Sequence, residues 1–237
     1  MATKPTEFLR ISDLHAFYGE SHILHGVDFD VARGEVVTLL GRNGAGKTTT
    51  LKSIMGIVPR REGSIVFEGQ ETIRLASNRI ARRGIAYCPE ERAIFASLDV
   101  EENLMLPPVV GEGGLPVAQI FELFPNLKER LSSPGTKLSG GEQQMLAMAR
   151  VLRTGAHLLL LDEISEGLAP VIVAKLGDMI RMLKAEGYTV VMVEQNFRFA
   201  APLADRFYVM EHGRIVETFA AAQLREKEAT LHELLGV

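Results

Sequence analysis

Cysteine is almost absent from this chain of 237 residues, which contains only Cys88. A single thiol excludes an internal disulfide and any metal site built from several cysteine ligands. Chains without disulfides are typical of a reducing compartment, so we expect the protein to work in the cytoplasm.

Positive charge is not in excess, because 26 Lys and Arg residues stand against 30 Asp and Glu residues, a formal net charge of −4. A chain without a basic field has little to attract a nucleic acid backbone, so we expect no nucleic acid partner. Long apolar runs are also missing, since none approaches the roughly 18–20 residues that span a bilayer. Residues 1–7 lack the apolar core of a signal peptide. We therefore expect that any work at a membrane depends on other chains.

The most informative stretch that is present covers residues 41–48, where the spacing G-x-x-x-x-G-K-[ST] predicts a phosphate-binding loop. A β-branched apolar run, residues 35–40, precedes it, and residues 49–55 have the pattern of a helix. Backbone N–H groups and the positive end of the helix dipole would hold an anion in such a loop. The expected nucleotide contacts are Gly41, Arg42, Asn43, Gly44, Ala45, Gly46, Lys47, Thr48 and Thr49.

Two side chains of this loop carry specific roles in the prediction. We expect Lys47 to reach the β- and γ-phosphates and to serve in catalysis, and Thr48 to bind Mg²⁺. The alternative interpretation is a glycine-rich turn that only caps the following helix. The lysine and the hydroxyl at fixed offsets favour the nucleotide site.

A second site is indicated by four leucines, residues 158–161, that lead directly into Asp162 and Glu163. An apolar run without alternation predicts a strand buried on both faces, and ligands bind at the carboxyl end of such strands. We expect Asp162 to orient Mg²⁺, and Glu163 to take a proton from, or to orient, the water that attacks the γ-phosphate. An acidic pair at a strand end is common by itself, and it is the combination with the phosphate loop that favours catalysis.

The third informative stretch contains Ser139, Gly140, Gly141 and Glu142. Locally it predicts a capping box, with Ser139 as N-cap and Glu142 as its partner three residues later. The two glycines weaken the first helical turn by roughly 1 kcal/mol each relative to alanine, so a plain cap does not explain them. They leave backbone N–H groups uncovered, which predicts a second helix start that binds a phosphate.

The order of the predicted elements indicates an α/β protein with a mostly parallel core sheet. Two predicted strands, residues 8–18 and 23–31, are joined by a polar turn and indicate an antiparallel start. Residues 99–154 change to helical patterns broken by proline and glycine, which predicts an inserted helical lobe. We expect one domain over the whole chain, with its core formed by residues 1–98 and 155–237.

Residues 41–48, 138–144 and 158–163 stand in the order of the Walker A, LSGGQ-type signature and Walker B motifs, and the chain resembles the nucleotide-binding subunits of ABC transporters over nearly its whole length. The resemblance implies a P-loop NTPase core of RecA type, ATP and Mg²⁺ as ligands, and ATP hydrolysis. It also implies a head-to-tail dimer, in which each signature closes over the ATP held by the partner's phosphate loop. Tyr18 stands where the family stacks an aromatic ring on adenine.

Several positions depart from the commonest pattern of this family. Glu90 stands nearest the place of the Q-loop glutamine, and its carboxylate can bind Mg²⁺ or its waters but repels phosphate. Gln195 stands in place of the usual switch histidine, and its amide can donate to the γ-phosphate but cannot carry a positive charge. Ile164 replaces the proline that often follows the Walker B acids. These departures concern the rate of hydrolysis more than the binding of ATP.

Three short stretches are similar to the short ATPase subunits of branched-chain amino-acid importers: Pro89-Glu90, the G-L-A-P of residues 167–170 and the V-E-Q-N of residues 193–196. This resemblance implies a place at the cytoplasmic face of the membrane, held there by two permease subunits that contact residues 90–105. A second ATPase subunit, identical or related, and indirectly a periplasmic binding protein are the further expected partners.

Three other functions remain open from the sequence. The first is an ATPase of the same branch that serves a urea or short-amide importer. The second is a soluble ABC ATPase that acts on DNA or ribosomes, although no basic groove or tandem ATPase domain is visible. The third is a module that holds nucleotide with little turnover, which Glu90 and Gln195 suggest.

Overall fold

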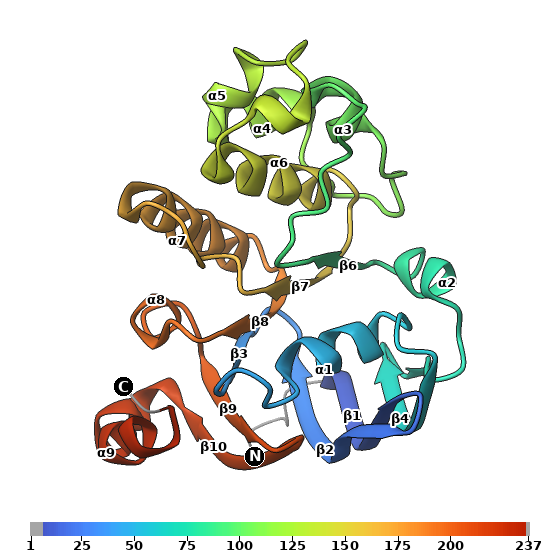
Figure 1. Ribbon diagram of the computed structural model, residues 1–237, viewed down its shortest axis with the longest axis vertical. Coiled ribbons are helices and arrows are strands. Elements are labelled where there is room, and N and C mark those ends of the chain that lie inside the picture. Colours follow the sequence, from blue (N-terminus) through green and yellow to red (C-terminus); the bar gives the residue numbers. More distant parts are fainter. Residues whose placement is uncertain (1–6, 236–237) are drawn as a thin grey trace.

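Two β-sheets and a helical lobe make up residues 7–235, the part of the chain that the computed structural model describes (Figure 1). Residues 1–6 and 236–237 lie outside the described residues. The prediction that residues 1–7 lack the apolar core of a signal peptide falls almost entirely on this undescribed part. None of the helices in the described part is both long enough and apolar enough to cross a membrane.

The larger sheet has six strands in the order β10-β9-β3-β8-β7-β6. Its strands are β3 (Val36–Leu40), β6 (Ile85–Cys88), β7 (Leu158–Asp162), β8 (Thr189–Glu194), β9 (Arg206–Glu211) and β10 (Arg214–Ala220). All pairings are parallel except that of β9 with β10. Every residue of β3, β7 and β8 is buried, which explains why their sequences do not alternate. The predicted mostly parallel core sheet is therefore confirmed.

The smaller sheet is antiparallel and has the order β2-β1-β4-β5. Its strands are β1 (Glu7–Tyr18), β2 (Ser21–Ala32), β4 (Arg60–Phe67) and β5 (Gln70–Glu71). Helix α1 (Lys47–Ile54) contacts β1 and β2 on one side and β7 of the larger sheet on the other. Apolar side chains of both sheets and of α1 form one buried cluster, so the helix that follows the phosphate loop is fixed between two sheets.

The helical lobe gathers at one end of the molecule, above the larger sheet in Figure 1. Its helices are α3 (Val100–Met105), α4 (Val117–Leu123), α5 (Pro125–Lys128) and α6 (Gly140–Leu152), with a short 3-10 turn at Gly135–Lys137. All of them fall inside the predicted insertion, residues 99–154. The strands on either side of the lobe in sequence, β6 and β7, are neighbours in the sheet.

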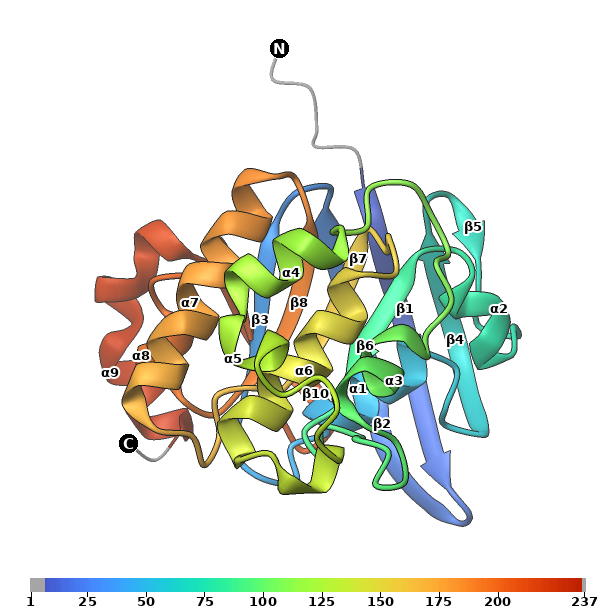
Figure 2. The same ribbon diagram turned by 90° about the horizontal axis from the view of Figure 1, so that it is seen from above.

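The remaining helices pack around the larger sheet, and Figure 2 shows α7, α8 and α9 together on one side of it. They are α2 (Ser77–Ala81), α7 (Pro170–Ala185), α8 (Phe197–Ala200) and α9 (Leu224–Leu235), the last preceded by a 3-10 turn at Ala221–Gln223. The long helix α7 begins after the loop that carries Glu163, so this loop connects β7 to the helical layer.

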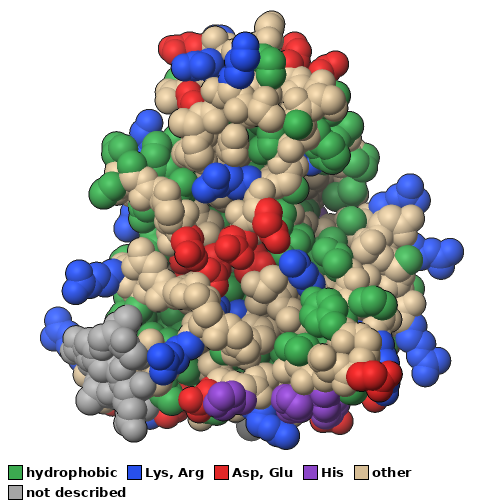
Figure 3. Space-filling view, viewed as in Figure 1, with side chains coloured by type: hydrophobic (Ala, Val, Ile, Leu, Met, Phe, Trp, Pro, Cys, Tyr) green, Lys and Arg blue, Asp and Glu red, His purple; other side chains and the backbone are tan. Residues whose placement is uncertain are grey.

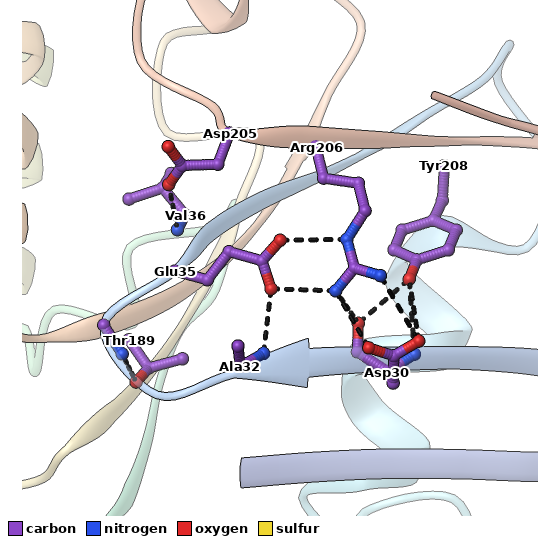
Figure 4. Close-up of polar contacts among 9 residues, drawn as sticks. Asp30, Ala32, Glu35, Val36, Thr189, Asp205, Arg206 and Tyr208 are labelled. Carbon is purple, nitrogen blue, oxygen red and sulfur yellow. Dashed lines mark hydrogen bonds and ion pairs between the residues drawn. The ribbon is translucent and has the colours of Figure 1, made fainter. Parts of the chain in front are cut away.

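Arg206 on β9 joins the two sheets near the start of β3 (Figure 4). Its guanidinium donates to Glu35 Oε2 at 2.8 Å and to Asp30 Oδ2 of β2 at 3.0 Å. The Tyr208 hydroxyl donates to the Asp30 backbone oxygen at 2.9 Å. An arginine that donates to two carboxylates through a planar fork fixes their relative positions. This network anchors the turn between β2 and β3, and with it the strand that leads into the phosphate loop.

Candidate ATP site

The phosphate loop lies between β3 and α1, and its glycines are required by close backbone contacts. A Cβ at Gly41 would lie 2.5 Å from the Met210 backbone oxygen, and one at Gly46 would lie 2.8 Å from Leu24 Cδ2. Gly46 also has φ 103°, and no side chain caps the helix that it opens. The first N–H groups of α1 are therefore open toward the loop, as an anion site at a helix start requires.

Lys47 curls under this loop with its ammonium group buried. Its Nζ donates to the Gly41 backbone oxygen at 2.8 Å and to that of Arg42 at 3.2 Å, and lies 3.3 Å from Glu163 Oε1. Of the other predicted contacts, Arg42, Asn43 and Gly44 are exposed at the top of the loop. The loop is thus held by a cation that also faces the carboxylate of Glu163, directly after β7.

Asp162 is completely buried and receives two hydroxyl hydrogen bonds. The Thr48 hydroxyl donates to Oδ1 at 2.8 Å, and the Tyr87 hydroxyl donates to Oδ2 at 2.7 Å. Burial raises the pKa of Asp162, and these two donors oppose that rise. The structure therefore places together Thr48 and Asp162, two of the three predicted metal ligands. Their hard oxygen atoms are the donor set that Mg²⁺ prefers, so they fit this ion.

Glu163 takes a left-handed backbone conformation, with φ 47°, directly after β7. Its Oε2 accepts a hydrogen bond from Gln195 Nε2 at 2.7 Å, and its backbone N–H donates to the Val193 oxygen at 2.9 Å. Although burial opposes it, hydrogen bonds from Glu166 and Gln195 and the charge of Lys47 lower the pKa of Glu163. The carboxylate is thereby kept ionised and able to accept a proton.

Three acidic side chains meet beside the loop, and Figure 3 shows acidic side chains gathered near the centre of this face of the molecule. Carboxylate oxygens of Glu90, Glu163 and Glu166 all lie within 4.8 Å of one another. A hydrogen bond to Glu163 raises the pKa of Glu166 to about 7, and burial and then Glu163 raise that of Glu90. A shared proton or a cation relieves the repulsion in such a group. Glu90, the third predicted metal ligand, thus lies with Glu163, the predicted catalytic carboxylate.

These groups line one cavity of about 300 Å³, together with Asn43, Gly44, Thr49 and Ile23. Tyr18 stands at the end of β1 with 44% of its surface exposed, so its ring is free to stack. Residues of the loop, of the acidic group and of the switch position Gln195 are therefore brought to one place. The structure does this through the ends of β3, β6, β7 and β8.

The predicted capping box is present at the start of α6. The backbone N–H of Ser139 donates to Glu142 Oε2 at 2.8 Å, and that of Glu142 donates to Ser139 Oγ at 3.3 Å. A Cβ at Gly140 would lie 3.2 Å from Arg92 Nη1, and one at Gly141 would lie 3.0 Å from Ile172 Cγ1. Close packing against these two side chains therefore adds a reason for the glycines.

The signature residues do not meet the phosphate loop within one chain. Among the described residues, no hydrogen bond or ion pair joins residues 139–142 to residues 41–49. Residues 139–142 instead open a helix of the lobe, at a distance in the fold from the start of α1 (Figure 1). Each chain thus carries two separate helix starts suited to phosphate.

Sequence reasoning missed three side chains that support the site. Tyr87 holds Asp162, Glu166 joins the acidic group, and Glu194 is buried at the end of β8. The Ser165 hydroxyl donates to Glu194 Oε2 at 2.8 Å, and burial raises the pKa of Glu194 to about 8. The one signal in the sequence was an acid, Glu194, directly after the apolar residues 190–193 and next to Gln195.

Known proteins resemble this chain over nearly its whole length. A family model described as ABC transporter matches residues 24–166. The high-affinity branched-chain amino acid transport ATP-binding protein BraG of Pseudomonas aeruginosa is 46% identical over 231 residues, covering 96% of this chain and 99% of its own length. The probable branched-chain amino acid transport ATP-binding protein LivF of Archaeoglobus fulgidus is 36% identical over 233 residues, covering 97% and 99%.

A solved structure supports the fold independently of close sequence similarity. The crystal structure of a nucleotide-free ATP-binding cassette from an ABC transporter superposes with a TM-score of 0.84 at 23% identity, covering 98% of this chain and 99% of that one. The two-sheet arrangement with an inserted helical lobe is therefore the fold of these cassettes. With the match of the family model and the two relatives, it follows that the chain belongs to the ATP-binding subunits of ABC transporters.

Proposed function

We propose that this chain is the ATP-hydrolysing subunit of an ABC importer for branched-chain amino acids. The transport named for two relatives of nearly equal length, at 46% and 36% identity, supports the substrate class. The observation that carries the enzymatic part is the meeting of Lys47 and Glu163, at 3.3 Å, beside the Thr48 and Asp162 pair. A loop for phosphate, the Thr48 hydroxyl and the Glu163 carboxylate thereby line one cavity, and Asp162 is bonded to Thr48 from the buried side.

Each residue of the site has a separate task in the proposed reaction. The N–H groups of residues 41–48 hold the phosphates, and Lys47 turns from its carbonyl partners toward them. Thr48 and Asp162 hold Mg²⁺, which supplies charge neutralisation at the phosphate oxygens. Glu163 accepts the proton of the attacking water, and Gln195 orients the carboxylate. Tyr18 stacks on the adenine ring.

The site is proposed to be completed by a second ATPase subunit, identical or related. Support comes from the separation of residues 139–142 from the phosphate loop within one chain. A partner that supplies Ser139, Gly140 and Gly141 would add the donors of a second helix start to the γ-phosphate. Glu142 would keep its place in the capping box at the start of α6. Residues 99–154 are proposed to act as one helical subdomain that carries this helix to the partner.

The permease subunits are proposed to dock where the lobe meets the core. A mostly apolar cavity of about 300 Å³ lies there, lined by Tyr87, Pro89, Ala93, Pro107, Val110 and Arg150. Phe95, Met105, Leu106 and Val109 are large apolar side chains left exposed around it. An exposed apolar groove of this kind suits a short helix of a partner chain. Docking there would hold the subunit at the cytoplasmic face of the membrane, with a periplasmic binding protein as an indirect partner.

Uptake by cells that lack this chain tests the proposed substrate. Cells with the gene deleted should lose uptake of labelled leucine, isoleucine and valine, and should regain it with the wild-type chain but not with Lys47→Ala. Uptake of urea and acetamide serves as the comparison. Dependence of urea uptake on the chain, with leucine uptake unchanged, would instead favour an importer of short amides.

A further inference from the structure

Three of the six histidines in the sequence lie on the hairpin of β1 and β2. His15 and His25 are directly opposite in the strand register, and His22 is opposite Phe17. Figure 3 shows histidine side chains gathered at the lower edge of the molecule, apart from the acidic patch at its centre. The proposed reaction uses none of these histidines.

The imidazoles of this group are close enough to act together. His15 Nδ1 lies 3.0 Å from His22 Nε2, and the rings of His22 and His25 have their centroids 4.0 Å apart. The His22 ring also stacks on Phe17 at 4.2 Å, with an interplanar angle of 15°. This stacking fixes the plane of the His22 ring, so its nitrogen is held toward His15.

The second nitrogen of His15 is also occupied. His15 Nε2 lies 3.0 Å from Asp13 Oδ1, so the carboxylate sets the ring to present Nδ1 to His22. A carboxylate bonded to the far nitrogen of a histidine is the usual support of a metal ligand, because it fixes the tautomer and raises the basicity of the ring. The hairpin thus contains a carboxylate, a histidine and a second imidazole in line.

The two facing nitrogens lie 3.0 Å apart, slightly closer than two ligands on one metal ion. Zinc binds imidazole nitrogen at about 2.0–2.1 Å in tetrahedral geometry, so two such ligands on one ion are roughly 3.3 Å apart. A small rotation of the two rings away from their hydrogen bond would let both nitrogens point to one ion, which would take the place of the shared proton. Imidazole ligands select zinc, copper or nickel, whereas the oxygen ligands beside the phosphate loop select magnesium.

We propose that His15 and His22 chelate a divalent transition metal ion, with zinc as the physiological occupant, and that Asp13 positions His15 for this task. His25 becomes the third ligand when its ring turns toward the pair, and water completes the coordination. The bound metal would cross-link the end of β1 to the start of β2, next to Tyr18.

Zinc titration of the full chain, purified without a histidine tag and stripped with a chelator, tests the site. We expect one Zn²⁺ per chain, measured by competition with a chromophoric chelator. His15→Ala and His22→Ala should each weaken binding at least tenfold, and Asp13→Asn about tenfold. His157→Ala, which changes an exposed histidine before β7, is the matched control and should bind as the wild type does.

Two further measurements identify the ligands and guard against unfolded variants. Melting curves without metal should be alike for all variants, and zinc should raise the melting temperature only where His15 and His22 are both present. X-ray absorption should show imidazole nitrogen in the zinc shell. A shell of oxygen alone, or zinc affinity unchanged by His22→Ala, would overturn the proposal, because the metal would then lie at the acidic group.

Discussion

Gln195 Nε2 lies 2.7 Å from Glu163 Oε2, so the side chain that follows β8 holds the carboxylate that follows β7. A histidine, which the resemblance leads one to expect at position 195, would bring a titratable charge to this contact. The amide brings none, because it does not itself titrate. Among the residues that the structure describes, Lys47 is the cation that pairs with Glu163, at 3.3 Å.

Glu163→Gln should lower ATP hydrolysis by about 10²–10⁴-fold while ATP binding is retained, because the amide cannot accept a proton from water. Phosphate release with Mg²⁺ and ATP measures the first quantity, and fluorescence of a labelled nucleotide measures the second. Glu163→Asp is the control, because the shorter side chain keeps the negative charge but moves the carboxylate away from the attacking water. Equal turnover of wild type and Glu163→Gln would remove this residue from the mechanism.

Lys47→Ala should weaken ATP binding by about 2 kcal/mol, or roughly 30-fold, through the loss of a charged hydrogen bond to phosphate. The nucleotide dissociation constant is the quantity to measure. Lys52→Ala, on the same helix, removes a cation whose Nζ lies 3.9 Å from Glu91 and should have little effect. The role of Lys47 would be contradicted if both variants bound ATP equally well.

Glu194 should make the protein less stable as the pH rises. Burial raises its pKa from 4.5 to about 8, so between these values the folded chain keeps a proton that the unfolded chain has lost. The free energy of unfolding should therefore fall toward pH 8, by at most about 1.4 kcal/mol per pH unit from this group.

Urea unfolding at pH 5.5, 6.5 and 7.5 measures this effect, with Glu194→Gln as the comparison. The glutamine stays neutral, and its amide can still pair with the Ser165 hydroxyl and N–H. The difference between variant and wild type should grow in favour of the variant as the pH rises. If the free energies of unfolding of the two proteins changed with pH in parallel, Glu194 would not be the group that keeps a proton in the folded chain.

Tyr87→Phe should raise the Mg²⁺ concentration needed for half-maximal hydrolysis. The substitution removes the donor at 2.7 Å from Asp162 Oδ2 and leaves Thr48 as the one hydroxyl on this buried carboxylate. Loss of the bond should also destabilise the fold by about 1–2 kcal/mol. Tyr188→Phe, which removes a hydroxyl that donates to the Gly113 oxygen at 2.8 Å, controls for the general loss of a tyrosine hydrogen bond. A Mg²⁺ requirement unchanged by Tyr87→Phe would contradict the role of Tyr87.

The phosphate loop, the acidic strand end and the capping box were predictable because each is a local pattern. Residues 41–48 need only the strand before them and the helix after them, and Ser139 meets Glu142 within one turn. The mostly parallel sheet was predictable from the alternation of strands and helices. These parts of the fold and of the site depend on neighbours in the sequence.

The supporting side chains depend on contacts between distant segments, and these were not predictable. Tyr87 meets Asp162 only because β6 pairs with β7, an order of strands that no local pattern contains. Glu166 meets Glu90 through the same pairing, and Glu194 meets Ser165 across the pair of β7 and β8. Helix α9 has no counterpart among the predicted elements, and it lies at the end of the chain, beyond the last strand.

The attachment of the helical lobe has a mechanical consequence. The chain leaves β6 at the edge of the sheet where Glu90 stands, and it re-enters β7 at the opposite edge, where the His157 and Leu158 N–H groups donate to the Gly84 oxygen. A lobe attached at both ends of this strand pair can tilt about the hydrogen-bonded contact at Gly84, and such a tilt moves the chain most at the end beside Glu90. We therefore expect a tilt of the lobe to displace Glu90 within the acidic group beside the phosphate loop.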